Sequence, residues 1–144
     1  MAGLYIHIPF CASRCIYCGF YSTTKTNLQD RYVEALCKEM NLRRNELVIA
    51  NEKIKTIYIG GGTPSQLSLA NITKIFTHIY DVWGPKVDAE EVTIECNPDD
   101  ITDEFAKAIA QLPINRVSMG AQTFNDDRLK FLHRRHCSDE VKTA

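Results

Sequence analysis

Three cysteines lie close together near the start of the chain, at positions Cys11, Cys15 and Cys18. Thiolates at this spacing on one loop can bend around a single cluster and supply three of the four ligands that an iron–sulfur cube needs. One iron would then stay open to another ligand, whereas electron-transfer clusters usually have all four corners filled by protein. The same residues also suit zinc, with a histidine such as His7 as the fourth ligand, or three reduced structural thiols.

A glycine-rich turn and a carboxylate follow farther along the chain. The segment Gly60–Pro64 lacks the lysine and the spacing of a phosphate-binding P-loop, and it is also typical of a tight turn from strand to helix. Its three glycines nevertheless let backbone NH and CO groups approach a ligand closely. Glu95 ends an apolar stretch before Asn97 and Pro98, where its carboxylate either binds a sugar hydroxyl or lies at the surface.

The hydrophobic pattern places these groups at the ends of strands. Apolar strand segments alternate with segments of helical spacing, at a period of about 30 to 40 residues. Strands are predicted at 4–8, 55–59, 91–95 and 115–119, and helices at 27–49, at 68–80, from Thr102, and from Asn125 or Asp126. This alternation predicts an α/β fold with right-handed crossovers and a parallel sheet. Because loops after parallel strands meet at one edge, we expect one common site there.

Composition narrows the class of protein and its partners. The 144 residues are 44% hydrophobic and 24% charged, which predicts one soluble globular domain. The net charge of −1 gives no reason to expect a nucleic-acid partner. No segment has the apolar length of a membrane span, and a cytoplasmic location is predicted. The six cysteines then favour metal ligands or thiols over disulfides, with Cys37, Cys96 and Cys137 as structural or incidental thiols.

The segment from Tyr5 to Cys11, together with Cys15, Tyr17 and Cys18, resembles the signature of the radical S-adenosylmethionine (SAM) superfamily. The resemblance implies that the three cysteines hold a 4Fe–4S cluster and that the amino and carboxylate groups of SAM chelate its open iron. It also implies reductive cleavage of SAM to methionine and a 5'-deoxyadenosyl radical, and hence an electron donor as a partner. Tyr17 is expected close to the adenine, and Tyr5 among the cofactor-binding residues.

Two later segments resemble further cofactor contacts of the same superfamily. Gly61, Gly62 and Thr63 match a turn that contacts the amino group of SAM. Glu95 stands in a Glu-Cys-Asn-Pro segment that is similar to the family's Glu-x-Asn-Pro element, which implies a contact with SAM.

A third region completes the resemblance. Residues 116–124 are similar to an Arg-x-Ser-x-Gly-x-Gln-x-Phe segment, in which Gln122 would hydrogen-bond the ribose of SAM, because an amide both donates and accepts. Residues 132–136 resemble the Leu-x-Arg end of that segment, so Arg134 is the candidate for pairing with the SAM carboxylate. An arginine run on a helix is otherwise usually a solvated face.

The stretch His7–Phe10 narrows the resemblance to the oxygen-independent coproporphyrinogen III oxidase-like branch. Radical SAM cores of this type are incomplete barrels of six βα units, and the branch carries a further C-terminal domain. The chain is therefore expected to be the N-terminal part of such a core over residues 1–144, a partial barrel of about four units, with the remainder and the C-terminal domain absent. Its exposed parallel edge would invite self-association.

Two activities compete within this branch. The oxidase has a fourth cysteine two residues after the third, giving Cys-x-Cys, whereas this chain reads Cys18-Gly19-Phe20, which favours the haem-chaperone subgroup. Tyr21 and the short segment before the cluster motif favour the same subgroup. The resemblance thus implies a protein that binds and transfers haem, with haem or a porphyrin as its ligand. Oxidative decarboxylation of coproporphyrinogen III and a zinc-binding module remain the alternatives, and whether the chain cleaves SAM as an enzyme stays open.

Overall fold

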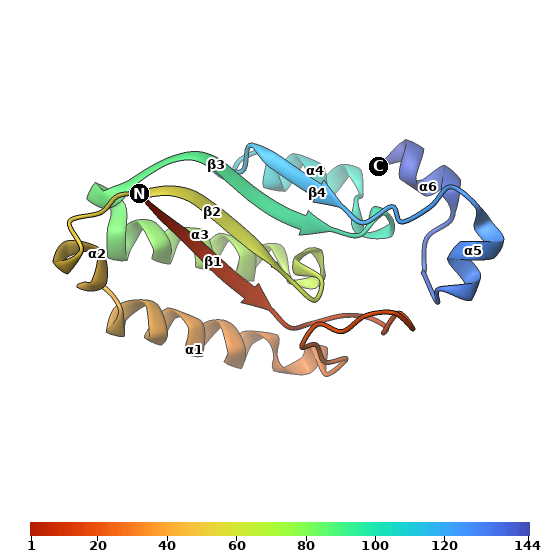
Figure 1. Ribbon diagram of the computed structural model, residues 1–144, viewed down its shortest axis with the longest axis horizontal. Coiled ribbons are helices and arrows are strands. Elements are labelled where there is room, and N and C mark those ends of the chain that lie inside the picture. Colours follow the sequence, from red (N-terminus) through yellow and green to blue (C-terminus); the bar gives the residue numbers. More distant parts are fainter.

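A four-stranded parallel sheet is the centre of the computed structural model, which describes residues 1–47 and 49–144 (Figure 1). Its strands are β1 (Ala2–Ile8), β2 (Ile54–Gly61), β3 (Val87–Cys96) and β4 (Arg116–Met119). They lie side by side in chain order, and every neighbouring pair is parallel. The α/β fold with a parallel sheet is therefore confirmed, and each strand begins or ends within a few residues of its predicted bounds.

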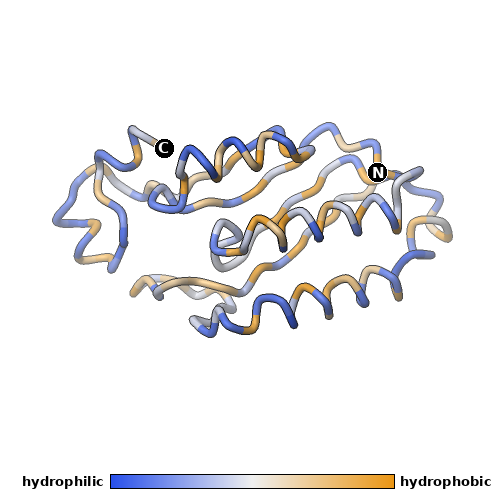
Figure 2. Tube along the Cα trace, turned by 180° about the vertical axis from the view of Figure 1, so that it is seen from behind, coloured by the Kyte–Doolittle hydropathy of each residue, from blue (hydrophilic) through white to orange (hydrophobic). Residues whose placement is uncertain are grey.

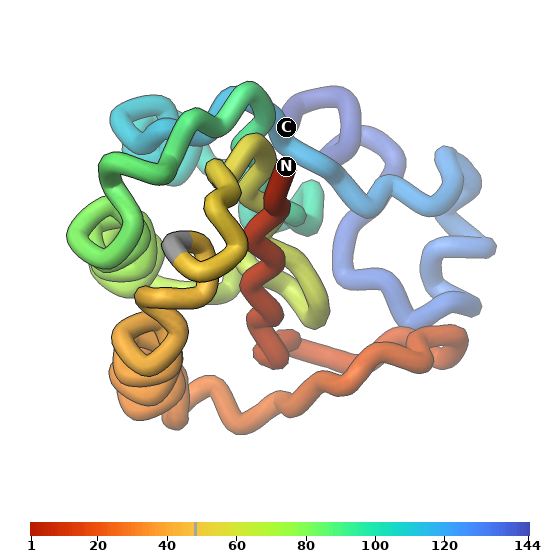
Figure 3. Tube along the Cα trace, turned by 60° about the vertical axis from the view of Figure 1, so that its left-hand side comes forward, coloured from red at the N-terminus to blue at the C-terminus, as the bar shows by residue number. Residues whose placement is uncertain are grey.

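Helices follow each strand. They are α1 (Gln29–Leu42), α2 (Glu46–Ile49), α3 (Leu69–Trp83), α4 (Asp103–Ile109), α5 (Asp126–Phe131) and α6 (Ser138–Thr143). Short 3-10 turns precede or follow them, namely η1 (Thr26–Leu28), η2 (Pro64–Gln66), η3 (Gly84–Lys86) and η4 (Pro98–Asp100). Seen from the side in Figure 3, α1, α3 and α4 lie along one face of the sheet, and the other face is left open.

The apolar core lies between the sheet and these helices. In β1, β2 and β3 the apolar residues that point to the helices are buried, namely Ile6 and Ile8, Ile57 and Ile59, and Val92 and Ile94. Helix α3 meets them with the apolar residues of its predicted inner face, Ile72, Ile75, Phe76 and Ile79. Hydrophobic and hydrophilic positions alternate along α1 and α3 in Figure 2, as this one-sided burial requires.

Side-chain caps fix where three of the helices begin. The Ser68 hydroxyl accepts a hydrogen bond from the NH of Asn71 at the start of α3. Thr102 and Asn125 do the same for α4 and α5, at 3.1 and 2.9 Å. Such caps satisfy backbone NH groups that have no partner inside the helix. They therefore set how far the loop after each strand extends.

The helix predicted over 27–49 is wrong in its second half. Helix α1 ends at Leu42, and only the single turn of α2 follows after a break at 43–45. The apolar spacing fails at this point, because arginines occupy the two positions that should follow Met40 on the inner face. Arg43 instead bridges Glu39 and Glu46 on the surface. Within the described residues, no helix is long and apolar enough to cross a membrane.

Candidate metal and cofactor site

The cysteine loop is closed at its base by backbone hydrogen bonds. Cys11 NH donates to the Thr23 carbonyl at 3.0 Å, and Thr23 NH donates to the Pro9 carbonyl at 2.7 Å. Inside the loop, the Arg14 guanidinium donates to the carbonyl of Ser22 at 2.7 Å. Phe10 anchors the base because its side chain is buried in the core, so the loop leaves β1 in a fixed direction.

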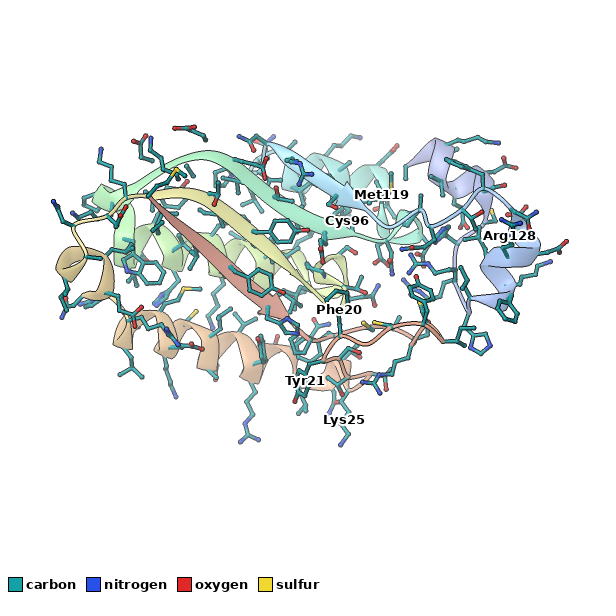
Figure 4. All side chains as sticks on the ribbon, in the orientation of Figure 1. Phe20, Tyr21, Lys25, Cys96, Met119 and Arg128 are labelled. Carbon is teal, nitrogen blue, oxygen red and sulfur yellow. The ribbon has the colours of Figure 1, made fainter. Side chains whose placement is uncertain are left out.

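A cavity of about 280 Å³ lies between this loop and the carboxyl ends of the strands. It is close to the lower limit of about 300 Å³ for small-molecule sites. All the predicted site residues except Tyr5 line it: Cys11, Cys15, Tyr17, Cys18, Gly61, Gly62, Thr63, Glu95, Gln122 and Arg134. Figure 4 shows where it lies, with Phe20 on the loop below it and Cys96 and Met119 at the strand ends above.

The three thiols share this cavity but differ in exposure. Cys11 is buried, Cys15 is half-buried and Cys18 is exposed. In the part of the chain that the structure describes, no three Cys, His, Asp or Glu side chains converge closely enough to hold a metal ion. The structure therefore brings the thiols to one cavity without closing them on a common centre, and their role as cluster ligands stays a prediction. Their soft sulfur donors fit an iron–sulfur cluster.

The glycine turn after β2 presses directly against the cysteine loop. Gly62 NH donates to the Ile8 carbonyl at 2.7 Å, and a Cβ on Gly62 would lie 2.9 Å from the carbonyl oxygens of Ile8 and Phe10. Gly61 has φ +116°, which side-chain-bearing residues rarely adopt. Because the Gly61 NH already donates to Glu95, an ammonium group at this turn would need carbonyl oxygens as its acceptors.

Glu95 is held in place from two directions. The Tyr58 hydroxyl donates to its Oε1 at 2.5 Å, and Gly61 NH donates to its Oε2 at 2.9 Å. The hydrogen bond to Glu95 raises the pKa of the Tyr58 hydroxyl, and burial adds to this effect. The carboxylate thus faces the cavity from a fixed position with lone pairs left for a ligand's hydroxyl groups. Tyr58 was not predicted, and its part depends on the pairing of β2 with β3.

Tyr5 and His7 lie on the open face of β1 beside this carboxylate. His7 Nε2 lies 2.9 Å from the Tyr21 carbonyl, which can only accept, so this nitrogen donates. In the neutral ring Nδ1 therefore accepts from the Tyr5 hydroxyl, at 3.0 Å. Both His7 nitrogens are engaged in this way, which leaves neither free for the zinc site considered above. Tyr5 also stacks on Tyr58, and the structure places it outside the cavity lining.

Arg134 reaches the cysteine loop from the far end of the chain. Its guanidinium donates to Asn97 Oδ1 at 2.8 Å, to the Gly120 carbonyl at 2.7 Å and to Cys15 Sγ at 3.4 Å. Its Nε is buried and has no hydrogen-bond partner among the described residues. Helix α5 ends at Phe131, so the arginine follows that helix and does not lie on a solvated helical face. A buried donor at a cavity wall suits an anionic group such as a carboxylate.

Gln122 and Tyr17 complete the cavity wall. Gln122 has φ +62° and an exposed side chain at the cavity, where its amide is free to meet a ligand. Burial raises the pKa of the Tyr17 hydroxyl, although the neighbouring Arg134 opposes this shift. Cys96 also borders the cavity, and burial raises the pKa of its thiol to about 12. Its expected packing role is confirmed, because it is 4% exposed and lies on the core face of β3.

An ion-pair cluster that sequence reasoning missed anchors the Arg134 segment. Arg135 lies 2.7 Å from Asp99 Oδ2 and 2.8 Å from Asp100 Oδ1. Asp100 in turn accepts from the Ser65 hydroxyl and the Gln66 amide, at 2.6 and 2.5 Å. These partners come from three separate loops, and no local sequence signal joins them. The cluster ties the turns after β2 and β3 to the segment that carries Arg134.

The parallel sheet with its cysteine loop defines the class of protein. Residues 5–144 match the radical SAM superfamily, and the chain belongs to that superfamily. Members of this class use a 4Fe–4S cluster and SAM.

Three individual proteins place the chain within the superfamily. It is 41% identical to the haem chaperone HemW of Lactococcus lactis subsp. lactis (strain IL1403) over 138 residues, 95% of this chain and 35% of that protein. It is 39% identical to the haem chaperone HemW of Bacillus subtilis (strain 168) over 146 residues, 100% of this chain and 38% of that protein. The solved structure of coproporphyrinogen III oxidase (HemN) from Escherichia coli, a radical SAM enzyme, superposes with a TM-score of 0.84 at 27% identity.

That superposition covers 98% of this chain and 32% of the HemN chain. The chain thus spans between about a third and two fifths of the length of the relatives it matches. Its four strands and their helices correspond to a partial barrel of the radical SAM type.

Proposed function

We propose that this chain carries the cluster- and SAM-binding part of a haem chaperone, a protein that binds haem and transfers it. The observation that supports this most directly is the meeting of four distant segments at one cavity. The cysteine loop, the glycine turn, the end of β3 and the Arg134 segment all line it. Together they offer soft sulfur ligands, carbonyl acceptors, a carboxylate and a guanidinium, which are the groups that a cluster and SAM require.

Each predicted residue has a distinct part in this proposal. Cys11, Cys15 and Cys18 hold the cluster, which when bound supplies the electron for cleavage of SAM. On the SAM side, Arg134 pairs with the carboxylate, the turn of Gly61, Gly62 and Thr63 receives the amino group, and Glu95 and Gln122 take hydroxyl groups of the ribose. Tyr17 lies near the adenine, and Tyr5 supports the cysteine loop through His7, which donates to the Tyr21 carbonyl.

The residues after the third cysteine support a haem-chaperone function over an oxidase function. Phe20 stands where the oxidase of this branch has a fourth cysteine, two residues after the third, and it is 66% exposed on the cysteine loop. Both HemW proteins compared above are named haem chaperones. In this proposal haem is the ligand, a one-electron donor is a partner, and the protein works in the cytoplasm. The outer edge of β4, with Val117 and Met119 partly exposed, is where self-association would occur.

The coproporphyrinogen oxidase is the second candidate, because the HemN structure superposes over almost the whole chain. The two activities separate in a decarboxylation assay. Release of carbon dioxide from coproporphyrinogen III, with SAM and a reductant present, would favour the oxidase. Retention of the porphyrin carboxylates, together with tight haem binding, would favour the chaperone.

Anaerobic reconstitution with iron and sulfide is the first test of the site. We expect about four irons per chain, and a change in the cluster's electron paramagnetic resonance spectrum when SAM is added. The triple variant Cys11→Ala, Cys15→Ala, Cys18→Ala should bind none. Cys37→Ala is the matched control, because this buried thiol lies in α1, away from the cavity. One zinc per chain, or equal iron in the triple variant, would contradict the assignment.

A further inference from the structure

Thr63 and Cys11 are joined by a buried hydrogen bond. The Thr63 hydroxyl donates to Cys11 Sγ over 3.5 Å, between residues that are 52 positions apart in the sequence. Thr63 is 7% exposed and Cys11 is 8% exposed, so water cannot readily compete for either group. A polar contact of this kind, away from solvent, is stronger than the same contact at the surface.

The backbone on both sides holds this contact in place. Gly62 packs against the carbonyls of Ile8 and Phe10 so closely that a Cβ would not fit, and this sets the position of the next residue, Thr63. Cys11 is fixed by its NH, which donates to the Thr23 carbonyl. The hydroxyl and the sulfur are therefore brought together by the geometry of the sheet edge.

We propose that Thr63 raises the reduction potential of the cluster by donating a hydrogen bond to its Cys11 ligand. This inference rests on the proposed function, because it requires Cys11 to bind the cluster. When a one-electron donor reduces the cluster, the added negative charge is shared by the sulfurs, and a hydrogen bond to sulfur becomes stronger. Hydrogen bonds to ligand sulfurs are among the factors that set cluster potentials. The hydroxyl therefore stabilises the reduced form more than the oxidised form.

Thr63 is the residue of choice for isolating this effect. Cys15 Sγ also accepts a hydrogen bond, from Arg134, but that guanidinium is proposed to bind the SAM carboxylate as well. Cys18 is exposed to solvent. A change at Arg134 would alter charge and potential together, whereas Thr63→Val removes one hydroxyl, keeps the shape of the side chain and leaves the charge unchanged. Because Thr63 also stands in the turn proposed to receive the SAM amino group, the comparison is made without SAM.

The test compares Thr63→Val with Thr63→Ser after anaerobic reconstitution. Iron is counted first, and the midpoint potential is then measured without SAM by titration with dithionite, followed by electron paramagnetic resonance. We expect Thr63→Val to disfavour reduction about tenfold, which for one electron is 59 mV towards lower potential. Thr63→Ser keeps the hydroxyl and should stay close to the wild type.

The outcomes separate this inference from the proposed function. A Thr63→Val protein with a full cluster and the wild-type potential would overturn the inference, and so would an equal shift in Thr63→Ser. If the valine variant holds no iron, Thr63→Ala replaces it as the variant without a hydroxyl. If neither Thr63→Val nor Thr63→Ala holds a cluster but Thr63→Ser does, the hydroxyl is required for cluster assembly. That result would overturn the inference that Thr63 raises the reduction potential. A wild type without iron would overturn the proposed function itself.

Discussion

Arg134 Nη1 lies 3.4 Å from Cys15 Sγ, although 119 residues separate them in the sequence. This single contact joins the last part of the chain to the first loop. The guanidinium also donates to Asn97 after β3 and to the Gly120 carbonyl after β4. One side chain therefore contacts the loops after β1, β3 and β4 at the cavity.

Replacement of Arg134 should weaken SAM binding more than cluster assembly. Arg134→Ala removes the charge, and we expect SAM affinity to fall by about ten- to a hundredfold, equivalent to roughly 1.4 to 2.8 kcal/mol. Arg134→Lys keeps the charge but not the planar fork, and should restore only part of the affinity. Titration of the reconstituted protein with SAM measures this. Arg128→Ala on α5 is the control, and an equal loss there would argue against a direct role for Arg134.

Gly62→Ala should destabilise the fold around the site. Its Cβ would meet the carbonyl oxygens of Ile8 and Phe10 and the carbonyl carbon of Pro9, all at 2.9 Å, and backbone cannot move aside as a side chain can. Overpacking of this kind costs about 1–3 kcal/mol. Urea unfolding compares it with Gly84→Ala, where a Cβ would meet nothing within 4 Å and the change should stay within about 1 kcal/mol. Equal stability of both variants would contradict the close approach.

Asp99 should make stability depend on pH in an unusual direction for a carboxylate. Burial raises its pKa, and neighbouring Asp100 adds to this, while Arg135 only partly compensates. The folded chain therefore holds the Asp99 proton more tightly than the unfolded chain. This tighter proton binding stabilises the folded chain fully below the pKa that Asp99 has in the unfolded chain. The stabilisation is lost as pH rises through the pKa of Asp99 in the folded chain. Asp99→Asn should thus gain stability relative to the wild type between acidic and neutral pH, as urea unfolding at several pH values would show.

Asp88 provides the opposite case within the same protein. Its hydrogen bond and charge interaction with Lys55 lower its pKa. Asp88→Asn should therefore lose stability relative to the wild type as pH rises from acidic to neutral. If both variants moved in the same direction, burial would not be the cause of the Asp99 effect.

The thiols should differ strongly in reactivity before a cluster is bound. Burial raises the pKa of Cys96 from 9.0 to about 12, so its thiolate fraction is roughly a thousandfold lower than that of an ordinary thiol. Iodoacetamide at mildly alkaline pH should label exposed Cys18 and Cys137 first, and Cys96 only after unfolding. Mass spectrometry locates the labels. Rapid labelling of Cys96 in the folded chain would contradict its position in the core.

The sequence predicted the parts of the fold that depend on local spacing. The apolar strand segments and the helix starts at Thr102 and Asn125 are local signals, and the structure has them where they were expected. The break after α1 was missed because Leu47 continued the apolar spacing beyond two arginines. Helix α6 was also missed, since Glu140 caps its start by accepting from Cys137 NH, a signal without an apolar repeat.

The candidate site was likewise predicted only in part. Resemblance and strand order predicted which loops would meet, but not the side chains that hold them together. Tyr58 contacts Glu95 only because β2 and β3 pair in one register. Arg135 contacts Asp99 only because the sheet brings their distant segments together. Such partners are set by long-range geometry, so they could not be derived from spacing in the chain.

The closure of the cysteine loop at Phe10 and Thr23 separates the fold of the sheet from the state of the thiols. The peptide between these residues is anchored at both ends, and the sheet beyond them is packed independently of what the thiols bind. Oxygen damage to a cluster would then disturb that peptide and its contacts with Thr63 and Arg134, but not the core of the sheet. We expect a chain that has lost a bound cluster to keep its folded sheet.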